Sequence, residues 1–204
     1  MTLRLGILIF DDAEELDFVG PWEVFTVANE VAEHEKMEKP FEAMMIAEKP
    51  DPVRCRKGMR VIPHATTADC GKLDILLVPG GQGTRREVNN RALLDWIAKV
   101  APDCAWVTSV CTGALLLAAA GPAKGKKVTT HWGFIEQLRA RGEVAKVLEQ
   151  VRYVRDGNVV TAAGVSAGID MALWLVGQIH SPVFARKVQR VMEYDPAPPY
   201  AAAV

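Results

Sequence analysis

The sequence of 204 residues has little of several features that would place it in a special class. It contains only four cysteines and no CxxC pair, so neither a disulfide framework nor a thioredoxin-type redox motif is indicated. Its four histidines lack HExxH or similar spacing, and we assign no metal. The formal net charge of -1 gives no general reason to bind nucleic acid or an acidic membrane.

Long apolar runs and nucleotide-binding motifs are also missing. The N-terminal run stops at Asp11 and Asp12, without the length or cleavage site of a signal peptide. The blocks Ala114–Ala120 and Met171–Val176 fall far short of the ~20 residues that a membrane-spanning helix needs. Neither a GxGxxG nor a Walker motif is present. We therefore expect a cytoplasmic protein with reduced thiols.

What the sequence does contain is a regular alternation of strand and helix patterns. The predicted buried strands are Leu3–Phe10, Phe41–Ala47, Ile75–Val78 and Ala105–Val110, with a hairpin-like piece at Val61-Ile62 and a hairpin pairing Val151–Val154 with Val159–Ala162. The predicted helices are Pro21–Ala32, Ala92–Val100, Thr112–Ala120, Trp132–Arg141, Ser166–Ile179 and Pro182–Glu193, the last with Phe184, Val188 and Val191 facing inward. The pattern predicts one α/β domain over residues 1–196, with a mostly parallel sheet covered by helices on both faces, and a tail over residues 197–204.

A cysteine stands where one of these strands gives way to a helix. In VTSVCTGALLLAAAG, a β-branched run leads to Cys111, and Thr112 and Gly113 allow the tight turn of a strand-turn-helix elbow. The free N–H groups and the dipole of a helix start favour a thiolate, which is the nucleophilic form. The alternative is a buried cysteine that only fills space. Cys104, at the other end of the same strand, is expected to be inert.

Two further segments are expected at the same edge of the sheet, where the carboxyl ends of parallel strands gather reactive groups. Asp17 lies in the predicted loop after the first strand, and a carboxyl near a thiolate can act as general acid or base. The alternative for Asp17 is a helix N-cap or a solvated loop acid. Gly80 and Gly81 follow the third strand and leave backbone N–H groups open to a developing negative charge, unless they form only an ordinary turn.

A serine motif points to a different chemistry. GVSAG, residues 164–168, matches the GxSxG elbow of serine hydrolases, which need an acid and then a histidine after the serine. Here only His180, at a predicted helix end, and then Asp195 follow, which is the wrong order. We therefore interpret Ser166 as part of a helix start assisted by glycine.

Six motifs together resemble the ThiJ/PfpI superfamily, relatives of the class I glutamine amidotransferase domains. In chain order they are LDFVGPWEVF, LLVPGGQG, VTSVCTGALLLAAAG, KKVTTHWGFIEQL, VVTAAGVSAGIDMALWLV and MEYDPAPPY, which together span essentially the whole chain. The resemblance implies a flavodoxin-like three-layer sandwich that forms a homodimer. It assigns the nucleophile to Cys111, the acidic partner to Asp17 and the anion-binding amides to Gly80 and Gly81, and it places His131 near the cysteine.

Details of these motifs resemble one branch, the isonitrile hydratases. The details are Asp17 where many members have Glu, the Cys111-Thr112-Gly113 elbow, the TTHW stretch and the YDP-x-PP tail. The resemblance implies hydration of an isonitrile to an N-substituted formamide. For this reaction we expect the Thr112 hydroxyl to hold substrate or water and the Thr112 N–H to hold the developing charge, and the chemistry requires no cofactor. Taken alone, His131 is more typical of a helix-start histidine with a local hydrogen bond. The alternatives are a glyoxalase-type or deglycase-type enzyme acting on α-oxoaldehydes, and a redox sensor that oxidises Cys111.

Overall fold

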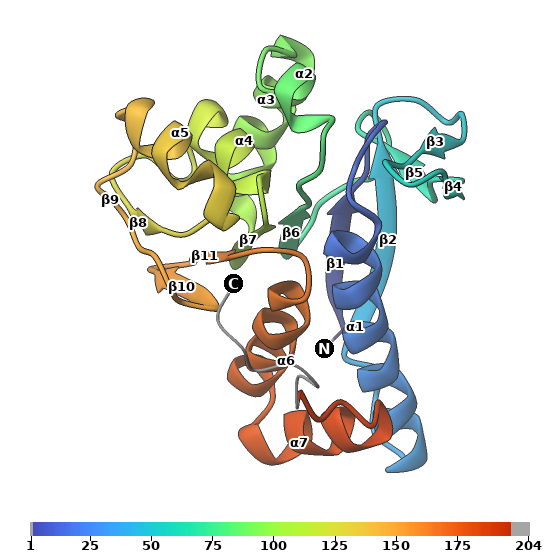
Figure 1. Ribbon diagram of the computed structural model, residues 1–204. Coiled ribbons are helices and arrows are strands. Elements are labelled where there is room, and N and C mark those ends of the chain that lie inside the picture. Colours follow the sequence, from blue (N-terminus) through green and yellow to red (C-terminus); the bar gives the residue numbers. More distant parts are fainter. Residues whose placement is uncertain (1, 197–204) are drawn as a thin grey trace.

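Short runs of aliphatic and β-branched residues form the strands of the computed structural model, which describes residues 2–196 (Figure 1). The strands are β1 (Leu3–Leu8), β2 (Phe41–Ala47), β3 (Val53–Arg54), β4 (Arg60–Val61), β5 (Ala65–Thr66), β6 (Ile75–Val78), β7 (Trp106–Val110), β8 (Lys127–Val128), β9 (Lys146–Val147), β10 (Tyr153–Asp156) and β11 (Val159–Ala162). The helices are α1 (Glu15–His34), α2 (Thr84–Glu87), α3 (Arg91–Val100), α4 (Gly113–Ala120), α5 (Ile135–Ala140), α6 (Ala167–Ile179) and α7 (Pro182–Val191), with 3₁₀ turns at Ala101–Asp103 and Trp132–Phe134. The predicted tail lies outside the described residues.

The central sheet is parallel except at one edge. Its order is β10-β11-β7-β6-β1-β2-β5, and only the pairing of β10 with β11 is antiparallel. The chain passes from β1 outward to β2 and then returns to the other side of β1 as β6. Ligand sites of open α/β sheets form at such a reversal of strand order, beyond the carboxyl ends of the strands. A site is therefore expected beyond the carboxyl ends of β1 and β6.

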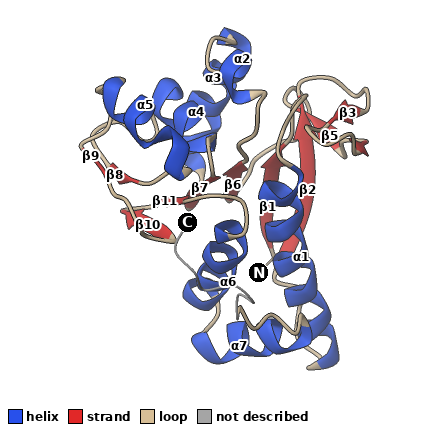
Figure 2. Ribbon diagram, viewed as in Figure 1, coloured by secondary structure: helices blue, strands red, loops and turns tan. Residues whose placement is uncertain are grey.

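Helices cover both faces of this sheet, as Figure 2 shows. On one face α1, α6 and α7 pack against one another, and on the other face α3 packs against α4. The core between these layers is aliphatic, and β6 and β11 are buried along their whole length because they are covered on both sides. The predicted three-layer α/β class is confirmed. Within residues 2–196, no helix is long and apolar enough to cross a membrane.

The prediction was wrong about the start of the first helix. Helix α1 begins at Glu15 rather than near Pro21, so Asp17 lies in its first turn and not in a loop. Pro21 removes one helical hydrogen bond, but burial of Phe18 and Phe25 on the same helix outweighs that loss.

The last helix and the short edge elements also differ from the prediction. Val191, expected to face inward, is 57% exposed, because α7 ends at this residue and the apolar stripe ends with it. The short strands β3, β5, β8 and β9 and the four-residue helix α2 were not predicted. They are too short to show a periodic pattern, and the short strands are held by pairing of β3 with β4, of β5 with β2 and of β8 with β9.

Candidate active site

The predicted elbow is present at the end of β7. Cys111 has a φ of 54°, in the left-handed region that non-glycine residues rarely adopt. The Cys111 N–H donates to the Ala163 carbonyl at 2.7 Å, and the Thr130 hydroxyl donates to the Cys111 carbonyl at 2.8 Å. Strained backbone of this kind persists only where neighbours fix it, and it gathers at functional sites.

Asp17 reaches the elbow from the first turn of α1, and its side chain is fully buried. Its Oδ2 accepts a hydrogen bond from the Gly80 N–H at 2.8 Å. Its Oδ1 has no hydrogen-bond partner at normal distance, and the Cys111 thiol faces the carboxyl. The structure thus brings together a thiol and a carboxyl from elements that are far apart in the sequence.

The Gly80-Gly81 turn does not play the role predicted for it. The Gly80 N–H is used by Asp17, and the Gly81 N–H donates to the Thr112 hydroxyl at 3.0 Å, so neither amide is open to a substrate anion. A Cβ on Gly80 would lie 2.5 Å from the Thr112 nitrogen. The missing side chain therefore lets this turn approach the elbow closely and fix Asp17 and Thr112.

Two other amides take the place expected for Gly80 and Gly81. The backbone N–H groups of Thr112 and Val165 face the Cys111 sulfur and lower the pKa of the thiol. Val165 has a φ of 35°, so its backbone is strained like that of Cys111, whose sulfur its N–H faces. The role of Val165 was not predicted, because a backbone donor leaves no trace in side-chain chemistry. The only signal was the glycine before it, in the serine-like motif.

The ionisation of the thiol and the carboxyl is linked. Burial raises the pKa of Asp17 from 3.8 to about 7. Burial also raises the pKa of the Cys111 thiol to about 12, and the negative charge of Asp17 adds to this rise. The prediction of a readily ionised thiolate was therefore wrong, because desolvation outweighs the donors at the elbow. At pH values between these two pKa values, the thiol and the carboxyl together hold one proton. When that proton lies on Asp17, the Cys111 sulfur carries the negative charge.

The other cysteines show that a raised pKa is not what distinguishes Cys111. Burial raises the pKa of Cys55 and of Cys104 to about 11, and it also raises that of Cys70. Cys104 packs at the far end of β7, where its thiol lies 3.4 Å from a backbone carbonyl. The strained turn, the two amides and the buried carboxyl are the features that set Cys111 apart. Among residues 2–196, no three His, Cys, Asp or Glu side chains gather to hold a metal ion.

His131 follows the threonine that holds the Cys111 carbonyl, and its own hydrogen bond is local. Its Nδ1 accepts from the Gly133 N–H at 3.2 Å, which caps the 3₁₀ turn. Its ring also packs so closely on Gly164 that a Cβ there would lie 2.7 Å from it. Partial burial and the charge of Arg85 lower its pKa, which favours the neutral imidazole. His131 therefore borders the site and supports the segment before Val165.

A hollow of about 830 Å³ adjoins the elbow. Val165, whose N–H faces the sulfur, lies in its wall. The apolar part of this wall is formed by Trp132, Ile135, Val151, Ala163 and Val165. The Glu149 carboxylate, also in the wall, pairs with Arg139. Arg152, also in the wall, is paired with Asp170 at 2.5 Å, so its charge is neutralised. The hollow can therefore accept an uncharged group attached to a reacting atom at Cys111.

Ser166 lies at the edge of the same hollow but has no catalytic partners. It is exposed, it directly precedes α6, and its hydroxyl accepts a hydrogen bond from Arg152 at 3.1 Å. His180 lies at the opposite end of α6, stacked on Phe184. The interpretation of this motif as a helix start is confirmed.

We expect Thr112→Val to destabilise the protein by about 1–3 kcal/mol, because valine leaves the buried Gly81 N–H without an acceptor. The neighbouring Thr84 hydroxyl, 3.0 Å from that of Thr112, loses a partner as well. Thermal unfolding measures the effect. Thr112→Ser keeps the hydroxyl and is expected to stay near wild type, and equal losses in both variants would contradict the hydrogen-bond account.

Known proteins resemble this chain over nearly its whole length. It is 37% identical over 200 residues to isonitrile hydratase of Pseudomonas putida, covering 98% of this chain and 82% of the relative. A solved ThiJ/PfpI family protein from Pseudomonas syringae superposes with a TM-score of 0.88 at 32% identity, over 100% of this chain and 80% of that one. DJ-1beta of Drosophila melanogaster shares the fold at a TM-score of 0.81 and 18% identity, over 96% and 100% of the two chains. The DJ-1/PfpI family model matches residues 4–178, and the chain belongs to this family.

Proposed function

We propose that the protein hydrates isonitriles, R–N≡C, to N-substituted formamides, with Cys111 as nucleophile and Asp17 as general acid and base. One observation carries the proposal: a buried carboxyl with an unpaired oxygen faces a thiol on a strained elbow. An isonitrile carbon can receive both a nucleophile and a proton, so it suits two groups that hold one proton between them. The similarity to isonitrile hydratase over 98% of this chain supports the substrate class.

In the first step, the proton of the pair lies on Asp17 and the charge lies on Cys111. The N–H groups of Thr112 and Val165 stabilise the sulfur anion in this form. The sulfur adds to the terminal carbon of the isonitrile while Asp17 delivers its proton to the same carbon. The product is a thioimidate, R–N=CH–S–Cys111, and Asp17 is left as the carboxylate.

In the second step, water hydrolyses this thioimidate. The Asp17 carboxylate takes one proton from water, the oxygen adds to the carbon, and the imine nitrogen receives the other proton. The C–S bond then breaks, which releases R–NH–CHO and restores the thiolate with a proton on Asp17. The overall change is the addition of one water molecule, and neither a cofactor nor an oxidant takes part.

The hollow beside Val165 is where we place the R group. Its apolar wall and its neutralised arginine favour an uncharged substituent. Because Val165 lines the hollow and its N–H faces the sulfur, we place the terminal carbon of such a substrate near Cys111.

The test is a product assay with the purified wild-type protein. We expect it to convert methyl isonitrile and benzyl isonitrile to the corresponding N-substituted formamides. Proton NMR of the formyl hydrogen detects these products. Methylglyoxal, assayed with the same preparation, tests the α-oxoaldehyde alternative. Turnover of methylglyoxal without turnover of either isonitrile would refute the proposal. So would peroxide-dependent oxidation of Cys111 with no turnover of any substrate, which is the behaviour of a redox sensor.

A further inference from the structure

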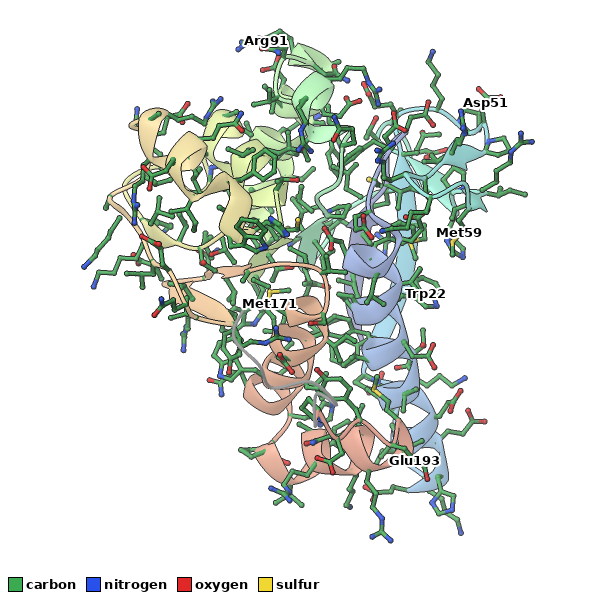
Figure 3. All side chains as sticks on the ribbon, viewed as in Figure 1. Trp22, Asp51, Met59, Arg91, Met171 and Glu193 are labelled. Atoms are coloured by element: carbon green, nitrogen blue, oxygen red, sulfur yellow. The ribbon has the colours of Figure 1, made fainter. Side chains whose placement is uncertain are left out.

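The short β3–β4 hairpin is fastened to the loop that leads into α1. The Asp12 N–H donates to the Arg54 carbonyl at 2.8 Å, and the Arg56 N–H donates to the Ala13 carbonyl at 2.9 Å. Lys57, at the tip of the hairpin, places its ammonium group on the Glu14 carboxylate. In Figure 3 the label Met59 marks this hairpin and the label Trp22 marks α1.

Glu14 is a charged neighbour of the proposed acid. The Glu14 N–H donates to the Gly80 carbonyl at 3.0 Å, while the Gly80 N–H donates to Asp17 at 2.8 Å. The Asp17 N–H in turn donates to the Glu14 carbonyl at 3.2 Å. The Glu14 side chain is only 15% exposed, whereas that of its partner Lys57 is 66% exposed. A largely buried negative charge is thus fixed by backbone contacts beside a buried carboxyl, and one lysine neutralises it.

We propose that Glu14 and Lys57 are positioning residues whose ion pair balances the charge facing Asp17 and so controls how readily the thiol–carboxyl pair loses its first proton. The effect of this ion pair on catalysis rests on the proposed function. The two residues do not touch the reacting atoms and act only through Asp17. The mechanism described above has no role for either of them.

The charges around Asp17 act in opposite directions. Beyond burial, the negative charge of Glu14 raises the pKa of Asp17 and the positive charge of Lys57 lowers it. The Cys111 thiol is a further titrating neighbour of Asp17. Glu15 faces Lys57, and its Oε1 accepts the Lys57 N–H at 2.6 Å.

The charges of Glu14 and Arg85 both act on His131, where they shift its pKa in opposite directions. Of these charged groups, Lys57 is the cation that pairs directly with Glu14. Removing the Lys57 charge leaves the Glu14 charge unbalanced beside Asp17. Removing the Glu14 charge leaves the positive charge of Lys57 unbalanced instead.

The experiment measures the pH dependence of Cys111 alkylation by iodoacetamide, together with the pH dependence of kcat/KM for methyl isonitrile. In both, the rate rises with pH as the pair loses its first proton. We expect Lys57→Gln to move the midpoint of this rise to higher pH and Glu14→Gln to move it to lower pH, each by about half a pH unit or more at low salt. The double variant is expected to lie between the two.

A matched control carries the same charge change at another site. Lys39→Gln removes a lysine from an ion pair with Glu33, at the opposite end of α1 from Asp17, and should keep the wild-type midpoint. Lys57 is 66% exposed, and glutamine keeps nearly the size of each side chain that it replaces, so all variants are expected to fold, which thermal unfolding checks.

Unchanged midpoints in both variants, or shifts in the same direction, would overturn the inference. Alkylation needs no isonitrile, so it tests the ion pair even if the wild-type protein forms no formamide, a result that would sink only the proposed reaction.

Discussion

Cys111→Ala is expected to abolish formamide production, lowering kcat by at least ~10³-fold, because no other group in the site can form the thioimidate. The loss should not come from unfolding, because the change removes only one sulfur atom from a well-packed elbow. Formamide formation is followed by NMR, and circular dichroism confirms the fold.

Cys104→Ala is the matched control for this variant. Cys104 is also buried, at the other end of β7, and the pKa of its thiol is also raised by burial. Its loss is expected to cost about 1 kcal/mol of stability and to leave kcat within about twofold of wild type. Wild-type turnover in Cys111→Ala, or an equal loss of turnover in Cys104→Ala, would contradict the assignment of the nucleophile.

Asp17→Asn is expected to lower kcat by at least ~10²-fold and, at the same time, to make the protein more stable above pH 7. The asparagine oxygen can still accept the Gly80 N–H, but the side chain can neither deliver nor receive a proton. Burial raises the pKa of Asp17 from 3.8 to about 7, so folding disfavours its ionised form by roughly 4 kcal/mol. Asparagine has no such cost.

The effect of Asp17→Asn on stability depends on pH in a defined direction. A raised pKa in the folded state means that the stability due to protonated Asp17 is complete below pH 4 and is lost as pH rises to about 7. The new amide group lacks a full set of partners, a cost that does not change with pH. The variant should therefore be about 1–3 kcal/mol less stable than wild type in acid and about 1–3 kcal/mol more stable at pH 8, because it avoids the roughly 4 kcal/mol cost of the buried charge. Denaturant unfolding at both pH values measures the difference. A variant less stable than wild type at pH 8 would contradict the buried-charge account.

The sequence predicted the layers of the fold and the position of Cys111, because both depend on local patterns. The alternating apolar runs define the strands, and a cysteine between a β-branched strand and a glycine-containing helix start marks the elbow. The family resemblance then identified Asp17 as the partner. The homodimer, the cytoplasmic location and the roles of Thr112 and His131 stay predictions.

The features of the site that were not predicted depend on burial and on backbone groups, and a pattern of residues along the sequence does not report either. Asp17 was expected in the loop after the first strand, yet α1 begins before it and buries it completely. The amides of Gly80 and Gly81 were expected to be free, yet side chains distant in sequence already accept their hydrogen bonds. Desolvation of the thiol likewise appears only once the layers are packed, and it reversed the expected direction of its pKa.

The account rests on one proton being shared between the Cys111 sulfur and the Asp17 carboxyl. The most direct test is the rate of Cys111 alkylation against pH in wild type and in Asp17→Asn. The shared proton predicts a wild-type rate that rises with a midpoint near pH 7 and, in the variant, a midpoint displaced to clearly higher pH. The same midpoint in both proteins, or a wild-type rate that stays flat until strongly alkaline pH, would show that the carboxyl does not take the proton from the thiol.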